Sequence, residues 1–421
     1  MKLKKPKNEN YCGTIVRINS TIPLENCDNI QSTIIFGNSI IIGKDTKVGD
    51  TGVYFPAETQ LSHEYASINN LYRHSNLNTD QEKKGYLEDN RRIRTMRMRG
   101  NRSCGLFMPV SSLSTFVELG QLSEMDSFDE LTGTAICNKY IVKKRNPNVS
   151  GKKGKTPKIS KLINGQFRLH QDTTQFGKSI HLFHNSDIVG ITYKLHGTSV
   201  VISKVLCKKK LNWLFKVLKK LGVPIVDTEY DNIYSSRKVV KNDYLNTKQH
   251  FYDVDIWGLA NKELKEFLDD GLTIYAEIVG YLPSGAYIQK PYDYGCDDNE
   301  HKVYIYRITY TNISGKVFDF SHKQIQDWCK ERGLNPVPEL YYGYVSGLIY
   351  KESDNFSDNL MESIRGEFLE QDCFMCKTKL PAEGIVIRKE SNEFDAFKFK
   401  SFRFLEKESK QLDEGIEDIE G

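Results

Sequence analysis

The stretch ITYKLHGTSV (191–200) contains a lysine that could act as a nucleophile. Lys194 ends a short run of β-forming residues, and Gly197 follows in a turn where the missing side chain would let a phosphate approach the backbone. An unprotonated lysine at this point could attack the α-phosphorus of a nucleotide, form a phosphoramide and expel pyrophosphate. The alternative is an ordinary cation at the end of a strand, and the KxHG pattern alone does not decide between the two.

A nucleophilic Lys194 would need other cations nearby, because positive neighbours and burial both lower the pKa of a lysine. The segment FDAFKFKS (394–401) contains two lysines in a predicted strand. Side chains alternate along a strand, so Lys398 and Lys400 are expected on one face and the phenylalanines between and before them on the other, toward a core. We expect the two lysines to neutralise phosphate charge and to lower the pKa of Lys194.

Four further segments carry side chains suited to a nucleotide. Arg237 in SSRKVV could grip ribose or phosphate oxygens with its forked guanidinium. Glu277 lies in the apolar strand YAEIVG, where an unpaired carboxylate is costly unless it binds something, and Glu383 in PAEGIVIRK could serve a metal or a ribose. In VYIYRI, Tyr304 and Tyr306 share a strand face, and either could stack on a purine. Taken singly, each could instead form a strand-end ion pair or pack in a core.

The elements that would position these residues follow a simple order along the chain. Short β-rich runs separated by Gly, Asn and Asp turns fill residues 1–125 and predict a small β-barrel of the OB type, or a sandwich. Residues 141–165 contain Pro, Gly, Ser and Lys but few large apolar residues, and we expect a basic linker over 126–165. Residues 166–405 mix strands and helices, which predicts an α+β domain of mostly antiparallel strands, and 406–421 reads as an acidic tail.

Positive charge is clustered although the net charge is only +4. The segment RRIRTMRMRGNR (91–102) contains six arginines, and the tract 143–168 contains nine Lys or Arg residues and no acid. Clustered cations point to a polyanionic partner, most simply nucleic acid, and Arg94, Arg97 and Arg99 are the expected contacts. The alternative is that both tracts are solvated loops.

No membrane-spanning or secretory segment is evident in the sequence. The basic N-terminus MKLKKPKNEN lacks the apolar stretch of a signal peptide, and no apolar run approaches the length of a membrane span. We therefore expect a cytoplasmic protein with no membrane partner and no obligate protein partner. The segment VLCKKKLNWLFKVLKKLG (205–222) looks like a basic amphipathic insertion, and a surface helix is the favoured interpretation over an RNA contact.

The combined motifs resemble those of a known family. KLHGTS, SRK, YAEIVG, VYIYRI, EGIVIR and FKFKS are similar to motifs I, Ia, III, IIIa, IV and V of the covalent nucleotidyltransferases, which include ATP-dependent RNA ligases, DNA ligases and mRNA capping enzymes. The motifs occur in the family order between residues 194 and 400, and a histidine rather than an aspartate at position 196 resembles the RNA ligase branch. The expected barrel lies before the motifs and not after them. This order resembles the Deinococcus-type RNA ligases, in which an N-terminal OB domain precedes a nucleotidyltransferase (ATP-grasp-like) domain.

The resemblance implies roles for the residues around the nucleophile. Lys194 would be the residue that ATP adenylylates, and His196 and Gly197 would complete the turn below it. Lys398 and Lys400 would contact the α-phosphate.

The resemblance also implies how the rest of the nucleotide is held. Arg237 and Glu277 would bind it, with Glu277 on the ribose, and Tyr306 would stack on adenine. Glu383, with Glu277, would serve the divalent metal, Mg2+ or Mn2+. Many relatives have an acidic residue directly before the nucleophile, where it helps to read the adenine amino group. Tyr193 stands there in this chain, which puts base selection by that side chain in doubt.

The implied activity is ATP-dependent joining of RNA 3′-hydroxyl and 5′-phosphate ends through lysyl-AMP and adenylylated RNA, in RNA repair. The OB domain would hold nicked or broken RNA, or a hybrid duplex, through phosphate contacts. Two alternatives stay open from the sequence. One is another covalent nucleotidyltransferase of the capping type, and the other is a non-catalytic RNA-binding protein with a degenerate ligase domain.

Overall fold

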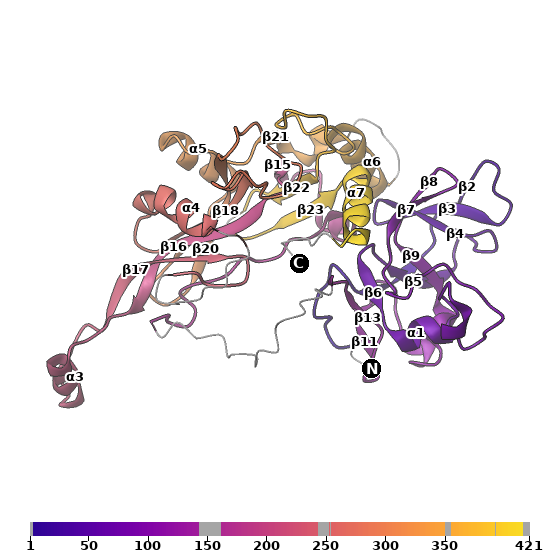
Figure 1. The fold of residues 1–421 in the computed structure, drawn as a ribbon, viewed down its shortest axis with the longest axis horizontal. Coiled ribbons are helices and arrows are strands. Elements are labelled where there is room, and N and C mark those ends of the chain that lie inside the picture. The colour runs from indigo at the N-terminus through magenta and orange to yellow at the C-terminus, as the bar shows by residue number, and fades with distance from the viewer. Residues whose placement is uncertain are drawn as a thin grey trace.

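The structure is a computed structural model that describes residues 3–142, 161–242, 252, 254–349, 355–391 and 393–415. A β-rich N-terminal region is followed by a larger region built on two five-stranded sheets (Figure 1). The basic tract expected over 143–168 lies outside the described residues except for 161–168. No helix within the described ranges combines the length and apolar character needed to cross a bilayer.

The N-terminal region is made of short strands, all of which pair antiparallel, and one short helix, α1 (His63–Ile68). Its strands are β1 (Gly13–Arg17), β2 (Ile22–Pro23), β3 (Ile30–Ile35), β4 (Asn38–Gly43), β5 (Thr51–Phe55), β6 (Thr59–Leu61), β7 (Thr95–Met98), β8 (Asn101–Cys104), β9 (Leu106–Pro109), β10 (Ser127–Phe128), β11 (Glu130–Leu131), β12 (Thr134–Ala135) and β13 (Cys137–Lys139). The largest sheet has the order β10-β1-β5-β9, a second has the order β2-β3-β4, and the others are pairs.

Pairing in this region continues past residue 125, the expected end of the first domain. Strand β10 pairs with β1, and β13 pairs with β6 as far as Lys139. The physical reason is a set of buried apolar side chains, Phe128, Leu131 and Ile136, which complete the N-terminal core. The range 126–165, expected as a linker, therefore begins with residues that belong to the first region.

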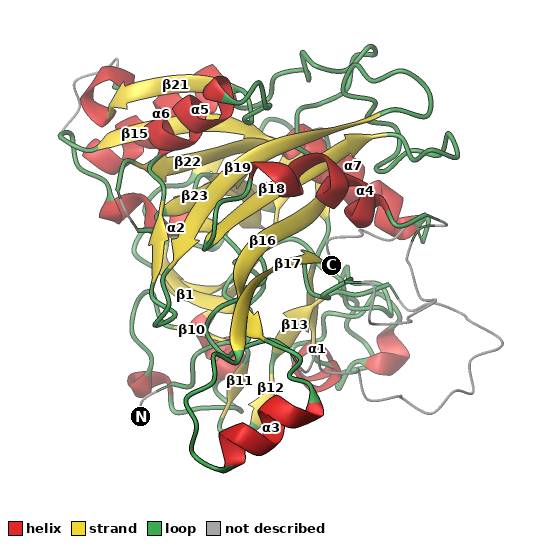
Figure 2. Cartoon of the chain, turned by 90° about the vertical axis from the view of Figure 1, so that its left-hand side faces the viewer, coloured by secondary structure: helices red, strands yellow, loops and turns green. Residues whose placement is uncertain are grey.

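The C-terminal region has two five-stranded sheets that lie beside each other (Figure 2). Its strands are β14 (Thr174–Gln175), β15 (Ile188–Lys194), β16 (Thr198–Lys208), β17 (Thr228–Ser236), β18 (Leu272–Gly280), β19 (His301–Thr311), β20 (Val317–Asp319), β21 (Glu339–Tyr344), β22 (Gly384–Lys389) and β23 (Ala396–Lys400). The sheet orders are β14-β23-β22-β15-β21 and β17-β16-β18-β19-β20. Among the described strands only the β14–β23 pair is parallel, so the expected α+β class with mostly antiparallel sheets is confirmed.

The helices of the C-terminal region differ in what they pack against. They are α2 (Phe176–Ser179), α3 (Trp213–Lys220), α4 (Ile256–Leu264), α5 (His322–Glu331), α6 (Phe356–Phe368) and α7 (Phe402–Asp413). Short 3₁₀ turns are η1 (Ser75–Leu77), η2 (Val110–Leu113), η3 (Leu119–Gln121), η4 (Ile180–Leu182), η5 (Lys265–Phe267) and η6 (Val345–Leu348). Apolar residues of α2 and α6 share a core with β15, β22 and β23, whereas those of α4 and α5 share a core with β16, β18 and β19.

Helix α7 occupies the first half of the stretch 406–421 that was expected to be an acidic tail. The helix begins after Ser401, whose side chain accepts a hydrogen bond from the backbone N–H of Phe404. It lies against β7 and β8 of the N-terminal region (Figure 1). Glu406 and Asp413 therefore pair with arginines of the N-terminal region, Glu408 pairs with Lys400, and the segment is helical as far as Asp413.

The contact between the two regions is built around a buried arginine. The Arg92 side chain is fully buried; it donates to Glu58 Oε2 at 2.8 Å and to Asp413 of α7. Ser409 of α7 donates to Glu58 Oε1 at 2.5 Å and accepts from the backbone N–H of Thr95 at 3.0 Å. Each charged group in this cluster has an opposite charge or a hydrogen-bond partner, which offsets the cost of burial.

Replacing Arg92 by Met should destabilise the protein by about 3–5 kcal/mol, because Glu58 would stay buried without its counter-charge. The matched change Arg94→Met, at a partly exposed arginine that also pairs with Asp413, should cost less than about 1 kcal/mol. Urea unfolding of both variants checks this. Equal losses would show that Arg92 contributes no more than a surface arginine.

Candidate active site

Lys194 lies at the end of β15, in a cleft whose walls come from both five-stranded sheets. The cleft has about 1290 Å³ of empty space including its open mouth. Lys194 Nζ is 2.7 Å from Glu383 Oε1, and the Lys194 side chain is 16% exposed. Lys194 is therefore accessible from the cleft, while the carboxylate of Glu383 balances its charge.

Strand register places two more lysines next to Lys194. On β23 the side chains alternate as expected, with Phe397 and Phe399 in the core and Lys398 and Lys400 lining the cleft. Lys194 pairs in register with Gly384 of β22, and Gly384 pairs with Lys400. Added at Gly384, a Cβ atom would lie 2.1 Å from the carbonyl oxygen of Phe399, so only glycine allows these strands to approach so closely.

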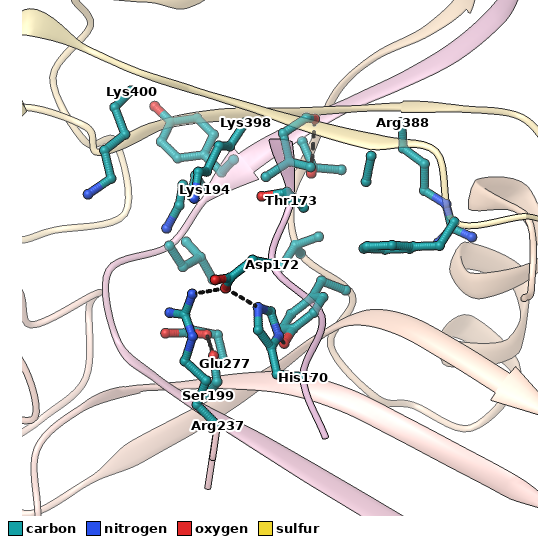
Figure 3. Close-up of a pocket in the computed structure, with 18 of the residues that line it drawn as sticks. His170, Asp172, Thr173, Lys194, Ser199, Arg237, Glu277, Arg388, Lys398 and Lys400 are labelled. Atoms are coloured by element: carbon teal, nitrogen blue, oxygen red, sulfur yellow. Dashed lines mark hydrogen bonds and ion pairs between the residues drawn. The ribbon is translucent and has the colours of Figure 1, made fainter. Parts of the chain in front are cut away.

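The electrostatics of the cleft are those of clustered, poorly solvated cations. Burial lowers the pKa of Lys398 to about 7, and repulsion from Lys194 and Lys400 adds to this effect. Figure 3 shows the side chains of Lys194 and Lys398 close together on one side of the cleft, with Asp172 and Arg237 opposite. A bound polyanion would relieve this repulsion.

Glu383 is the main counter-charge below the lysines. It is 2% exposed, and its Oε1 contacts Lys194 and, at 3.4 Å, Lys400. In the described part of the chain its Oε2 has no hydrogen-bond partner, and the His196 ring nitrogen Nδ1 is 3.9 Å away. A buried carboxylate oxygen without a partner is the kind of atom that a hard cation could use.

The turn after Lys194 packs tightly on β18. At Gly197 a Cβ atom would lie 2.3 Å from the carbonyl oxygen of Ile278. The Gly197 N–H and the Ser199 hydroxyl donate to the two oxygens of Glu277, at 3.1 and 3.0 Å. Gly197 was expected to make room for a phosphate, but the observed reason for glycine is this contact with a neighbouring strand. Glu277, expected to need a ligand, already has two hydrogen-bond donors.

The two candidate tyrosines on β19 have different surroundings. Tyr306 lines the cleft, and its hydroxyl lies 2.8 Å from Nδ1 of His170. Tyr304 packs against the same apolar cluster as Tyr306 but is not among the residues that line the cleft, and burial raises the pKa of its hydroxyl. Of the two, Tyr306 is the one positioned to meet a ligand in the cleft.

The segment containing His170 and Asp172 lines the cleft but was missed in the sequence. Asp172 pairs with Arg237, and the His170 ring lies 3.6 Å from the same carboxylate (Figure 3). The hydrogen bond from His170 and the charge of Arg237 hold the pKa of Asp172 well below its usual range. The available signal was weak: a histidine and an acid two residues apart, just before β14, which pairs with β23 at Lys398.

The N-terminal region also reaches the cleft, which the sequence did not indicate. Asn8, Asn10, Tyr11 and Lys139 are among the lining residues. The side-chain amide of Asn10 donates to the backbone oxygen of Thr173 at 3.2 Å. The mouth of the cleft is therefore formed jointly by the two regions.

Tyr193 occupies the position directly before Lys194 on β15. Its ring is buried and meets the ring of Phe374 edge-on at 4.8 Å between centroids. Its hydroxyl donates to the backbone oxygen of Asp372 at 3.4 Å. Tyr193 thus contributes an apolar surface to the cleft and no carboxylate.

The structure brings together six of the expected residues on the cleft surface. They are Lys194, Arg237, Glu277, Tyr306, Lys398 and Lys400. His196 and Gly197 lie in the turn behind this surface, and Glu383 lies beneath the lysines. No cluster of three or more His, Cys, Asp or Glu residues able to hold a metal occurs within the ranges that the structure describes.

The three arginines expected to contact nucleic acid lie elsewhere. Arg94 pairs with Asp413 at 3.4 Å, and Arg97 pairs with Glu406 at 3.0 Å, both acids on α7. Arg99 is exposed and donates to the backbone oxygen of Asn26 at 2.9 Å. Two of the three charges are therefore used within the protein, because α7 places acids opposite them.

Comparisons with known proteins agree with this architecture. A family model described as RNA ligase matches residues 187–404, more than half of the chain, and a model of an OB-fold domain matches residues 12–110. No curated protein matches the chain.

Several solved structures of a Naegleria gruberi RNA ligase are similar in fold. The structure with PPi has a TM-score of 0.60 and 18% identity over 96% of this chain and 99% of that chain. A mutant with ATP and Mn has a TM-score of 0.60 and 18% identity over 95% of this chain and 99% of that chain. Another mutant with AMP and Mn has a TM-score of 0.58 and 18% identity over 94% of this chain and 98% of that chain. The N-terminal OB-fold domain and the ligase-type fold after it are thereby confirmed.

The lowered pKa of Lys398 makes stability depend on pH. Between about pH 7 and the ordinary lysine value of 10.5 the unfolded chain binds more protons than the folded one, so stability should rise with pH across this window. Lys398→Met should therefore raise the free energy of unfolding near pH 7, and the gain should shrink toward pH 10. Urea unfolding without nucleotide at about pH 6, 8 and 10 measures it. An equal gain at each pH would contradict the assignment, and Lys330→Met, at an exposed helix position, is the matched control.

Proposed function

We propose, from the premise that the chain belongs to the RNA ligase family, that it uses ATP to join RNA 3′-hydroxyl and 5′-phosphate ends in the repair of broken RNA. The observation that carries this proposal is the placement of Lys194 in a cleft beside a second, buried lysine whose pKa is near 7. Such a cluster suits a polyanionic substrate and a lysine nucleophile. The fold likeness to RNA ligase structures solved with ATP or AMP supports the choice of nucleotide.

In the first step, neutral Lys194 Nζ attacks the α-phosphorus of ATP. A P–N bond forms as the P–O bond to the β-phosphate breaks, pyrophosphate leaves, and Nζ loses one proton to solvent to give the neutral phosphoramide nitrogen. Two influences act on Nζ beforehand: the pair with Glu383 favours the ammonium, and repulsion from Lys398 opposes it. Lys398 and Lys400 then offset the charge that develops on the α-phosphate oxygens.

The remaining cleft residues fit the nucleoside part of ATP. Tyr306 offers a ring for the adenine to stack on, held in place by the hydrogen bond from its hydroxyl to His170. Glu277 is fixed by the Gly197 N–H and the Ser199 hydroxyl, which suits a carboxylate that accepts from ribose hydroxyls. Arg237 would exchange its partner Asp172 for a phosphate or ribose oxygen.

A divalent cation fits the acidic side of this cleft. Glu383 Oε2 is buried and without a hydrogen-bond partner in the described residues, and Mg2+ or Mn2+ needs only one or two carboxylates when substrate phosphates supply further oxygens. When bound, the ion would lower the energy of the negative charge in each transfer. A metal role for Glu277 stays a prediction.

The later steps would follow from the same cleft. A 5′-phosphate oxygen of RNA attacks the phosphorus of lysyl-AMP, which breaks the P–N bond and frees Lys194. The RNA 3′-hydroxyl then attacks the 5′-phosphate, forms the phosphodiester and releases AMP. The OB domain beside the cleft mouth would hold the RNA through its phosphates, so sealing should weaken steeply with salt.

Incubation with α-labelled ATP and magnesium should leave label on the protein, and Lys194→Ala should abolish it, because no P–N bond can form. Lys330→Ala, on an exposed helix face, should label normally. Labelled GTP in a parallel reaction separates an ATP-dependent ligase from a capping-type activity. Label retained on the Lys194 variant would rule out Lys194 as the nucleophile.

Tyr306→Leu should raise the KM for ATP about tenfold or more, because the stacking surface is lost. Tyr306→Phe keeps the ring and loses only the bond to His170, so its KM should change much less. Initial rates of lysyl-AMP formation over a range of ATP concentrations give both values. If the Leu and Phe variants behave alike, or if Tyr304→Leu has the larger effect, the stacking assignment to Tyr306 is wrong.

A further inference from the structure

Helix α3 lies at the end of the ribbon formed by β16 and β17, well away from the other labelled elements (Figure 1). Strand β16 leaves β18 after Ser203, whereas its pairing with β17 continues for five more residues. At about 3.3 Å per residue, these carry the tip about 16 Å beyond the point where β18 leaves the ribbon. A small core of Val205, Cys207 and Ile233 fixes the ribbon. The helix is therefore held outward.

The tip exposes a group of large apolar side chains. No residue of α3 is buried, and Trp213 and Leu221 are 76% and 73% exposed. The exposed apolar residues of the tip are Trp213, Leu214, Phe215, Val217, Leu221, Val223 and Val226. A contiguous apolar surface rimmed by polar groups is typical of a binding site, whereas single exposed apolar residues are ordinary.

The apolar residues of α3 are gathered on one side of the helix. At about 100° per residue, an apolar face and a lysine face result. The apolar face contains Trp213, Leu214, Phe215, Val217, Leu218 and Leu221, and the other face contains Lys216, Lys219 and Lys220. Lys219 and Lys220 border the apolar face on its two sides, so their long stems can follow it while their amines stay in a polar layer.

All charged side chains over a long stretch of the tip sequence are positive. From Lys204 to Val226 the chain contains seven lysines and no Asp or Glu. The nearest acid, Asp227, pairs with Lys219. A ligand that suits this tip must therefore be anionic at its surface and apolar just beneath.

We infer that α3 is a docking element for a membrane surface rich in anionic phospholipid. The helix lies in the plane of the interface, with Trp213 and its neighbours among the acyl chains and the lysines at the headgroups. The inference goes beyond RNA joining and reverses the expectation of no membrane partner, which rested on the lack of a spanning segment. A helix that lies on a bilayer needs no such segment.

Two other occupants fit the tip less well. RNA offers phosphates to the lysines and base faces to Trp213 and Phe215, but it offers nothing to the aliphatic Leu and Val side chains. A second copy of the chain that packed through the same face would bring two sets of lysines together, and their repulsion would oppose the contact.

Flotation of the full chain with vesicles tests the inference. Partition onto vesicles of phosphatidylcholine with about 30% phosphatidylserine should exceed partition onto phosphatidylcholine alone at least about tenfold, and should fall as NaCl rises from about 0.1 to 0.5 M. The other two tryptophans, Trp257 and Trp328, are buried, so a blue shift of emission on binding reports Trp213.

Matched variants distinguish binding through this face from non-specific adsorption to vesicles. The triple change Trp213→Ser, Phe215→Ser and Leu221→Ser should lower partition at least about tenfold. The control Val48→Ser with Ile313→Ser removes exposed apolar side chains at other places and should leave partition unchanged. Lysyl-AMP formation should be the same in all three proteins.

Three results would overturn the inference. The first is undiminished flotation of the triple variant. The second is no preference for phosphatidylserine. The third is that the full chain does not float with vesicles, while the triple variant has lost RNA affinity or has lost a dimer that light scattering detects in the full chain.

Discussion

The ligase domain depends on holding three ammonium groups close together where water is scarce. Lys194 and Lys400 are in register with the same residue, Gly384, and Lys398 lies on the cleft face of β23. Like charges in this arrangement repel, and Glu383 beneath them supplies the compensating charge. The two sheets keep the three lysines together despite this repulsion, because each lysine belongs to, or ends, a hydrogen-bonded strand.

The parts of this arrangement that could be predicted are those set by local rules. Alternation along FKFKS placed Lys398 and Lys400 on one face, and the β-branched runs placed the strands that carry Lys194 and Glu277. Gly197 was predicted to make room for a phosphate, which stays a prediction, and the structure adds a reason for glycine that the sequence did not indicate, since a Cβ atom there would meet the backbone of β18. A glycine in the sequence does not tell which distant segment lies against it.

The parts that could not be predicted involve segments distant along the chain. Asp172 and His170 line the cleft because β14 joins the edge of β23, and Asn10 reaches it from the OB domain. The arginine cluster looked like a nucleic-acid surface because its acidic partners, Glu406 and Asp413, are some 300 residues later. Charge clustering in a sequence reports the need for a counter-charge and leaves open whether a ligand or the chain itself provides it.

Helix α7 begins two residues after Lys400, so the strand that lines the cleft and the contact with the OB domain form one continuous piece of chain. Lys400 Nζ also donates to Glu408 of α7 at 2.9 Å, one residue before the Ser409 that meets Glu58. Adjacent residues of α7 thus contact Lys400 on one side and the OB domain on the other. Any displacement of the OB domain that moved α7 would therefore change the balance between the contacts of Lys400 with Glu408 and with Glu383.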